Sequence, residues 1–142
     1  MGKATTPEEN KDIAIRLSTE VVIQKKNIDE LMAPDFVYHG PGGAPPMNRE
    51  ECLGFWAGLM NAFPDLSITF EDITAGGDIV MMRYTTRATH TGDFMGVPAT
   101  GVKTDVCGML TRKIVDGKVA EEWNYTDTLH LMKQLGIIPS GK

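Results

Sequence analysis

The hydrophobic period of the chain changes at Pro64, and this change limits the possible folds more than any other feature. Over residues 49–63, which follow a capping box at Asn48, apolar side chains recur at helical spacing. Over residues 66–71, apolar and polar side chains alternate, which is the period of a half-buried strand. Helices followed by a run of strands predict an α+β domain.

The N-terminal part of the chain is expected to be helical. Thr6 and Glu9 form a capping box, and the helical spacing of apolar residues predicts a helix over about residues 7–26. Asn27 is expected to cap a second, short helix at residues 28–32.

Alternating segments predict the strands of one sheet. Strands are expected at residues 35–39, 66–71, 80–88, 104–114 and 118–125. In the third of these, Met82 and Tyr84 are expected to point inward. Arg83 and Arg87 fall on the other face of the same strand, which should meet water.

This order of elements predicts a curved antiparallel β-sheet with the N-terminal helices packed on its concave face. All 142 residues are expected to form one domain, with residues 1–6 as a disordered tail. A final helix is expected after Asp127, with Leu129, Met132 and Leu135 as its buried side. A cavity should lie on the concave side of such a sheet, and a functional site is expected there.

Composition argues against several classes of partner. The net charge of −5 and the lack of a lysine and arginine cluster argue against nucleic-acid binding. No apolar stretch reaches the roughly 18 residues that a membrane span needs, and the N-terminus carries no export signal, so a cytoplasmic protein is expected. Cys52 and Cys107 lack metal-ligand spacing, so no metal is expected, and both are predicted to be buried, reduced thiols.

Five motifs carry a resemblance to a known family. They are Asp35-Phe36-Val37-x-His39, His90-x-Gly92-x-Phe94-x-Gly96-x-Pro98-x-Thr100-Gly101, Val115-Asp116-Gly117-Lys118-Val119, Trp123-x-x-x-Asp127 and Gln134-Leu135-Gly136. Over about residues 8–136 the chain resembles the SnoaL-like polyketide cyclases. This resemblance implies the cone-shaped α+β barrel that these cyclases share with nuclear transport factor 2 and ketosteroid isomerase.

The resemblance also implies cofactor-free acid/base chemistry on a hydrophobic polycyclic or aromatic carbonyl compound. In these cyclases a pocket aspartate removes an acidic C–H proton, and the enolate closes a ring by aldol condensation. The matching position here is Asn124, whose amide cannot remove a proton but can orient a carbonyl or stabilise an enolate oxygen. The pocket histidine of the family falls at Met109 or Leu110. A base other than the usual aspartate is therefore expected, either His39 or Glu122.

Four candidate catalytic residues each have a second possible role. His39 is either an acid/base at the mouth of the pocket or a hydrogen-bonded structural residue. Glu122 shares strand parity with Asn124, and is either a buried base or an exposed strand residue. His90 either contacts a ligand oxygen or holds the loop that it opens. Asp127 is either part of the site or the cap of the last helix.

The lining of the cavity is predicted to be mostly aromatic and methionine side chains. The expected residues are Tyr38, Trp56, Met60, Phe63, Met82, Tyr84, Phe94, Met109 and Leu110, some of which could equally be plain core. The two tyrosines could also donate hydrogen bonds to a ligand. Two functions remain open, an enzyme with acid/base chemistry and a non-catalytic protein that binds a hydrophobic small molecule.

Self-association is expected as well. Proteins of this fold commonly pair through the convex face of the sheet, where Trp123, Arg83 and Arg87 are expected to lie. The resemblance therefore implies a homodimer or a higher homo-oligomer.

Overall fold

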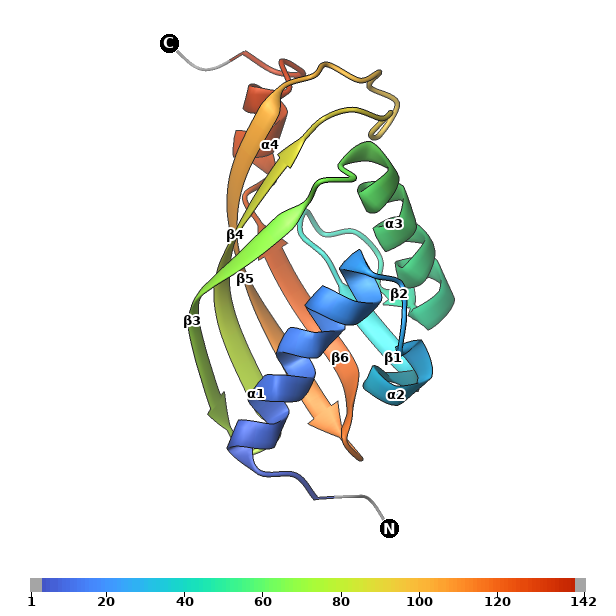
Figure 1. The fold of residues 1–142 in the computed structure, drawn as a ribbon, viewed down its shortest axis with the longest axis vertical. Coiled ribbons are helices and arrows are strands. Elements are labelled where there is room, and N and C mark those ends of the chain that lie inside the picture. Colours follow the sequence, from blue (N-terminus) through green and yellow to red (C-terminus); the bar gives the residue numbers. More distant parts are fainter. Residues whose placement is uncertain (1–3, 140–142) are drawn as a thin grey trace.

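The computed structural model describes residues 4–139, which form one curved sheet with helices on its concave side (Figure 1). The strands are β1 (Met32–His39), β2 (Met47–Asn48), β3 (Ser67–Gly76), β4 (Ile79–Thr89), β5 (Lys103–Val115) and β6 (Lys118–Thr126). The helices are α1 (Pro7–Arg16), the π-helical η1 (Leu17–Ile23), α2 (Ile28–Leu31), α3 (Arg49–Ala62) and α4 (Thr128–Gln134). In Figure 1, α1 crosses the concave face of the sheet and α3 stands on its β1 side.

The strand order is β2-β1-β6-β5-β4-β3, and the sheet is not closed into a ring. Every pair of neighbours is antiparallel except β1 and β6, which run parallel. The predicted α+β class, with helices on the concave face, is confirmed, and the sheet is mixed rather than wholly antiparallel. No hairpin joins β1 to β6, so their relative direction is not restricted to the antiparallel one.

The helix caps predicted at Thr6 and Asn48 are present. The Thr6 side chain accepts a hydrogen bond from the Glu9 backbone at 3.1 Å, and the Asn48 side chain accepts one from the Glu51 backbone at 2.9 Å. The predicted cap at Asn27 was wrong. Its backbone is left-handed, with φ at 58°, and its side chain makes no capping bond with α2.

The predicted helix over residues 7–26 changes type at Leu17, where α1 passes into η1, and it ends at Ile23. Of the expected tail at residues 1–6, the first three lie outside the described residues, and Thr6 caps α1. None of the helices within residues 4–139 combines the length and the hydropathy that a bilayer crossing requires.

Two burial predictions were wrong. Leu129 is 57% exposed, because α4 packs through Leu131 and Leu135 instead. Cys107 is exposed on β5, whereas Cys52 is buried on α3 as expected. In an alternating strand an exposed position separates two inward ones, and Cys107 occupies such a position.

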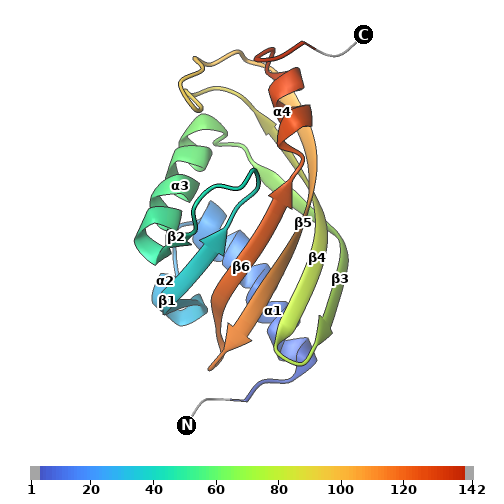
Figure 2. The ribbon, with the colours of Figure 1, turned by 180° about the vertical axis from the view of Figure 1, so that it is seen from behind.

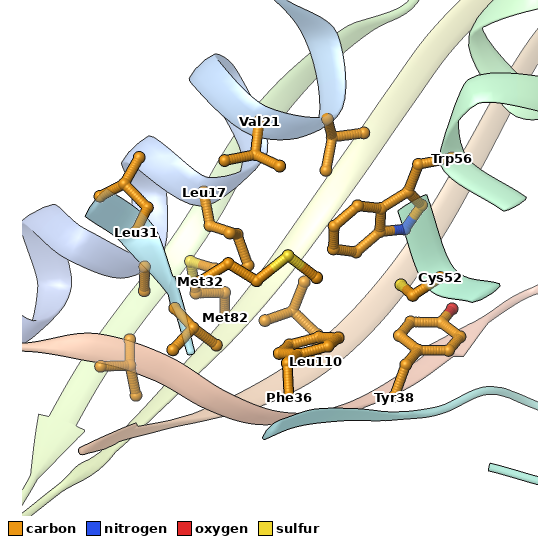
Figure 3. Close-up of a cluster of buried hydrophobic side chains, with 14 of the residues drawn as sticks. Leu17, Val21, Leu31, Met32, Phe36, Tyr38, Cys52, Trp56, Met82 and Leu110 are labelled. Atoms are coloured by element: carbon orange, nitrogen blue, oxygen red, sulfur yellow. The ribbon is translucent and has the colours of Figure 1, made fainter. Parts of the chain in front are cut away.

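The main core lies between η1, β1 and the inner face of the sheet. Figure 3 shows Leu17 and Val21 of η1 together with Met32 and Phe36 of β1 and Met82 of β4. This packing fills one part of the concave side. The remaining part, toward α3 and α4, holds the cavity described below.

Candidate functional site

A cavity of about 640 Å³ lies between the inner face of the sheet and α3. Strands β1 and β3 to β6 and α3 supply its walls, and residues 40–42 and 44–45, Met95 and the start of α4 also contribute to its lining. Most of the lining is apolar. The volume falls within the range of roughly 300–1,000 Å³ that small-molecule sites occupy.

Most of the predicted lining residues do face the cavity. They are Tyr38, Trp56, Phe63, Tyr84, Phe94 and Leu110. Met82 belongs to the core beneath η1, and Met60 is buried without lining the cavity. The prediction for Met109 was wrong. Its side chain is 61% exposed, because it alternates with the inward-facing Leu110 on β5.

Three polar side chains in a row on β6 face the cavity, namely Glu122, Asn124 and Thr126. A β-bulge sets their orientation, because β6 has one extra residue, Ala120, where its pairing with β5 shifts by one. A one-residue shift in register moves every following side chain to the other face. The bulge therefore gives the cavity a polar wall.

The Asn124 amide links two neighbours along this wall. Its Nδ2 donates to Glu122 Oε2 at 2.9 Å, and its Oδ1 accepts from the Tyr84 hydroxyl at 2.6 Å. A carboxylate can only accept, so the amide nitrogen must face Glu122 and the amide oxygen must face Tyr84. Asn124 is half-buried, and one of its N–H bonds has no partner within residues 4–139.

Tyr84 reaches this wall from β4 by crossing β5. Its hydroxyl also lies 2.7 Å from Thr126 Oγ1. The ring crosses at Gly108, where even a single methyl group would overlap with the phenol. Burial raises the pKa of the Tyr84 hydroxyl, which therefore keeps its proton for hydrogen bonding.

A buried ion pair lies at the inner end of the polar wall. Arg112 Nε donates to Glu122 Oε1 at 2.7 Å, and both side chains are almost fully enclosed. The Arg112 Nη1 group also donates to Ser18 Oγ at 2.8 Å and to the Ala14 carbonyl oxygen. Glu122 is thus buried as one of its two predicted roles requires, but with a cationic partner that satisfies its charge.

The sequence contains a pattern that indicates a buried, paired role for Arg112. Arg112 shares its strand face with Leu110 and Ile114, both of which are buried. An arginine on the apolar face of an alternating strand indicates one of two things. Either the predicted direction of that face is wrong, or the arginine is buried beside an acidic partner. The position of the turn does not predict its partner, because the bulge shifts the pairing of β5 with β6 by one residue.

The structure does not bring His39 to the cavity. Tyr38, the preceding residue, lines the cavity, so His39 points to the other face of β1. Its Nε2 lies 2.6 Å from Glu121 Oε2, and its ring stacks on Trp123 at a centroid distance of 5.2 Å. These contacts match the hydrogen-bonded structural role.

His90 is fully buried and holds the loop that follows it. Its Nδ1 accepts a hydrogen bond from the Thr100 backbone at 3.2 Å and lies 2.9 Å from Thr100 Oγ1. The ring packs against Phe63 and is not part of the cavity lining. The same loop meets the end of α3 at Gly92, where a side chain would collide with the Asn61 carbonyl oxygen.

Asp127 lies at the rim and also caps α4. Its side chain accepts a hydrogen bond from the His130 backbone at 3.1 Å, and the residue borders the cavity. Both of its predicted roles therefore remain compatible with its position. Residues 4–139 contain no group of three or more histidine, cysteine, aspartate or glutamate side chains arranged to hold a metal ion.

The model of the SnoaL-like polyketide cyclase family matches residues 15–135 of the chain. AclR, a candidate hydroxylase from Streptomyces galilaeus, is 28% identical, with a TM-score of 0.85 over 96% of this chain and 87% of that chain. A candidate SnoaL-like polyketide cyclase from Jannaschia sp. CCS1 is 26% identical, with a TM-score of 0.84 over 98% of this chain and 99% of that chain. IdmH, a candidate polyketide cyclase from Streptomyces antibioticus, is 34% identical, with a TM-score of 0.77 over 89% of this chain and 98% of that chain. No curated protein matches the chain.

Proposed function

Since this chain belongs to the SnoaL-like polyketide cyclase family, we propose that it binds a hydrophobic polycyclic or aromatic carbonyl compound and acts on it by acid/base chemistry without a cofactor. One contact carries the proposal. Asn124 Nδ2 lies 2.9 Å from Glu122 Oε2 on the wall of a largely apolar cavity. This spacing supports a hydrogen-bond donor and a carboxylate that act on the same bound molecule.

Asn124 is proposed to hold the carbonyl oxygen of the substrate. One N–H of its amide is used by Glu122, and the other has no partner within residues 4–139 and can donate to a bound molecule. An enolate oxygen accepts a stronger hydrogen bond than the carbonyl from which it forms, so the amide favours the enolate. Donors of this type typically contribute about 10²- to 10³-fold in rate.

Glu122 is proposed to take the proton through Oε2, since Oε1 is held by Arg112. The Arg112 guanidinium pairs with the carboxylate and leaves Oε2 as the oxygen that faces Asn124. A carboxylate can remove a proton from carbon when the C–H bond is already acidic, as it is between two carbonyl groups. The proposed reaction is therefore abstraction of such a proton, followed by attack of the enolate on a carbonyl of the same molecule.

A non-catalytic binding protein is the second candidate. The observation in its favour is that the charge of Glu122 is already matched by Arg112, while position 124 carries an amide instead of a carboxylate. In that case the same polar wall would orient a ligand without changing it.

Deuterium exchange separates the two candidates. An anthraquinone-type keto-ester is incubated with the protein in D₂O, and loss of its acidic C–H signal is followed by NMR. The enzyme should accelerate exchange, Glu122→Gln should abolish the acceleration, and Asn124→Leu, which keeps the ion pair, should slow it about 10²- to 10³-fold. Glu121→Gln, on the outer face, is the matched control.

Each other outcome is informative. Binding without accelerated exchange would support the binding protein, and no binding would contradict both candidates. A product heavier by one oxygen atom would instead indicate hydroxylation, for which AclR is a candidate enzyme.

The expected self-association belongs to this proposal as well. Figure 2 shows the outer face of β3 to β6, most of which has no helix in front of it, while α4 lies at its upper end. Met81, Met109 and Tyr125 are each more than half exposed there. We expect two copies to cover this face, and light scattering that gives a monomer mass at micromolar concentration would contradict the expectation.

A further inference from the structure

Two hydrogen-bond donors on the cavity wall have no partner. The Tyr38 hydroxyl from β1 and the Trp56 ring N–H from α3 make no hydrogen bond within the described part of the chain, and both residues line the cavity. Each residue is only 5% exposed. Their rings meet edge to face with centroids 6.2 Å apart, and Figure 3 shows the Tyr38 oxygen and the Trp56 nitrogen turned toward the same region beside Cys52.

The contrast with Tyr84 shows that these donors are unusual. The Tyr84 hydroxyl is bonded to both Asn124 and Thr126, as buried hydroxyl groups normally are. Among the described residues, His90 Nε2 is the one fully enclosed polar side-chain atom without a partner. The Tyr38 and Trp56 groups therefore keep access to the cavity, where a bound molecule could reach them.

The chemistry of both groups specifies their partner. Burial raises the pKa of the Tyr38 hydroxyl, which remains a donor, and an indole N–H can only donate. Because both groups only donate in this position, the partner is an acceptor oxygen such as that of a ketone, a quinone or an ether. A buried donor without a partner is unfavourable, and an acceptor oxygen on the ligand relieves this cost.

The pair lies on the β1 side of the polar wall of β6, where Tyr38 is the register partner of Glu122. Tyr38 packs on the α3 side, against Phe55 and Trp56. The Asn124 amide is held from the opposite direction by Tyr84 of β4. The two sets of donors thus reach the cavity from different sides of β6, so one ligand can meet them through different atoms.

We propose that Tyr38 and Trp56 form a second hydrogen-bonding site in this cavity, which takes a ligand oxygen other than the one held by Asn124. This inference rests on the proposed function. It narrows the substrate class to fused-ring compounds with acceptor oxygens on two separate edges, as in a quinone or an extended diketone.

Two probes of the same shape test the proposal. 9,10-Anthraquinone carries carbonyl groups on two opposite edges, whereas anthrone carries one. Binding of each to wild type and to Tyr38→Phe is measured by equilibrium dialysis under argon. Tyr125→Phe, which alters a tyrosine that is 62% exposed on the outer face, is the matched control.

The variant should weaken anthraquinone binding roughly two- to tenfold and leave anthrone nearly unchanged, because anthrone can turn its one carbonyl to Asn124. Equal weakening of both probes would overturn the assignment to a separate oxygen, and unchanged binding of both would overturn the donor pair. Failure of wild type to bind either probe would overturn both the proposed function and this site. Failure of the second site alone differs from this outcome, because wild type would still bind the probes.

A measurement without ligand tests the premise. Because the Tyr38 hydroxyl has no partner, Tyr38→Phe should unfold at the same urea concentration as wild type or at a higher one. Tyr84→Phe should unfold at a lower concentration, because it removes the hydrogen bonds that the Tyr84 hydroxyl makes with Asn124 and Thr126. A lower midpoint for Tyr38→Phe would show that the hydroxyl has a partner in the free protein and would overturn the proposal.

Discussion

The phenol of Tyr84 lies directly over the backbone of Gly108. The two residues are paired neighbours on β4 and β5, and a methyl group at position 108 would overlap with ring atoms of Tyr84. The missing side chain lets Tyr84 cross β5 and reach Asn124 and Thr126 on β6. The polar wall of the cavity thus depends on a glycine that contributes no polar group to it.

Gly108→Ala should displace Tyr84 and destabilise the protein by about 1–3 kcal/mol, because the added methyl group overpacks a buried contact. The affinity for the ligand should fall as well, because the displaced Tyr84 no longer holds Asn124. Urea titration measures the first effect and equilibrium dialysis the second. Gly58→Ala in α3, where nothing lies within 4 Å, is the control and should stabilise by about 0.5–1 kcal/mol. A Gly108→Ala variant with wild-type stability and binding would show that Tyr84 can leave its position without cost.

Arg112 and Glu122 should be strongly coupled. Arg112→Met leaves a buried carboxylate without its partner and should cost about 3–5 kcal/mol. The double variant Arg112→Met/Glu122→Leu should cost less than the sum of its single variants, as a double-mutant cycle of denaturation free energies would show. The exposed pair of Arg83 with Asp72 is the control, and its cycle should give about 0–1 kcal/mol. Additive effects for the buried pair would argue against a paired charge at Glu122.

Asn124→Asp should create two adjacent carboxylates. Since Asn124 Nδ2 lies 2.9 Å from Glu122 Oε2, the pair should hold a proton to higher pH than an isolated aspartate does. A pKa raised in the folded state adds stability below the unfolded pKa of about 3.9 and loses it as pH rises through the folded value. The free energy of unfolding of the variant should therefore fall furthest below that of wild type at neutral pH. Urea titrations from pH 3 to pH 8 test this, and a pH-independent difference would contradict it.

The same substitution tests the reactive position. If position 124 faces the acidic C–H bond, the new carboxylate should raise the rate of deuterium exchange into an anthraquinone-type keto-ester above that of wild type. No gain, with binding retained, would show that the bound ligand does not present this bond to position 124.

Strand alternation predicted which face of each strand is inward, but it could not show what covers that face. Met82 and Tyr84 share the inner face of β4, as expected, yet Met82 is core under η1 while Tyr84 lines the cavity. The difference arises from tertiary packing of α1 and α3 on one curved surface. Likewise, placing Met109 beside Leu110 in the lining ignored that consecutive strand residues face opposite sides.

The polar wall could be predicted only in part. The spacing of two residues between Glu122 and Asn124 predicts that both lie on one face, because residues two apart share a face in any regular strand. Their partner Arg112 requires the register, and a regular hairpin at the turn after Val115 would place it opposite Glu121. The bulge at Ala120 is a local backbone choice without a glycine or proline to mark it, so the buried ion pair was missed.

Asp65 should contribute to the acid sensitivity of the fold. Its carboxylate accepts hydrogen bonds from the Thr89 backbone at 2.7 Å and from the Thr89 hydroxyl at 2.8 Å, and these bonds lower its pKa. A lowered pKa adds stability above the unfolded value of about 3.9 and loses it as pH falls through the folded value. Asp65→Asn should therefore flatten the acid limb of the stability curve, which urea titrations between pH 2 and pH 7 would measure. An NMR titration that gave Asp65 an ordinary pKa would contradict this.

The loop from Thr91 to Gly101 should loosen when His90 is replaced. His90 Nδ1 accepts from the Thr100 backbone, and the His90 backbone binds Gly101 and Val102 on the far side of the loop. His90→Phe keeps the ring packing but removes the acceptor, so amide exchange over the loop should accelerate while the strands stay protected. His130→Phe, in α4, is the control for replacing a histidine. Because this loop carries part of the cavity rim, ligand affinity should fall together with the loss of protection. Unchanged exchange in His90→Phe would show that the backbone bonds hold the loop without the imidazole.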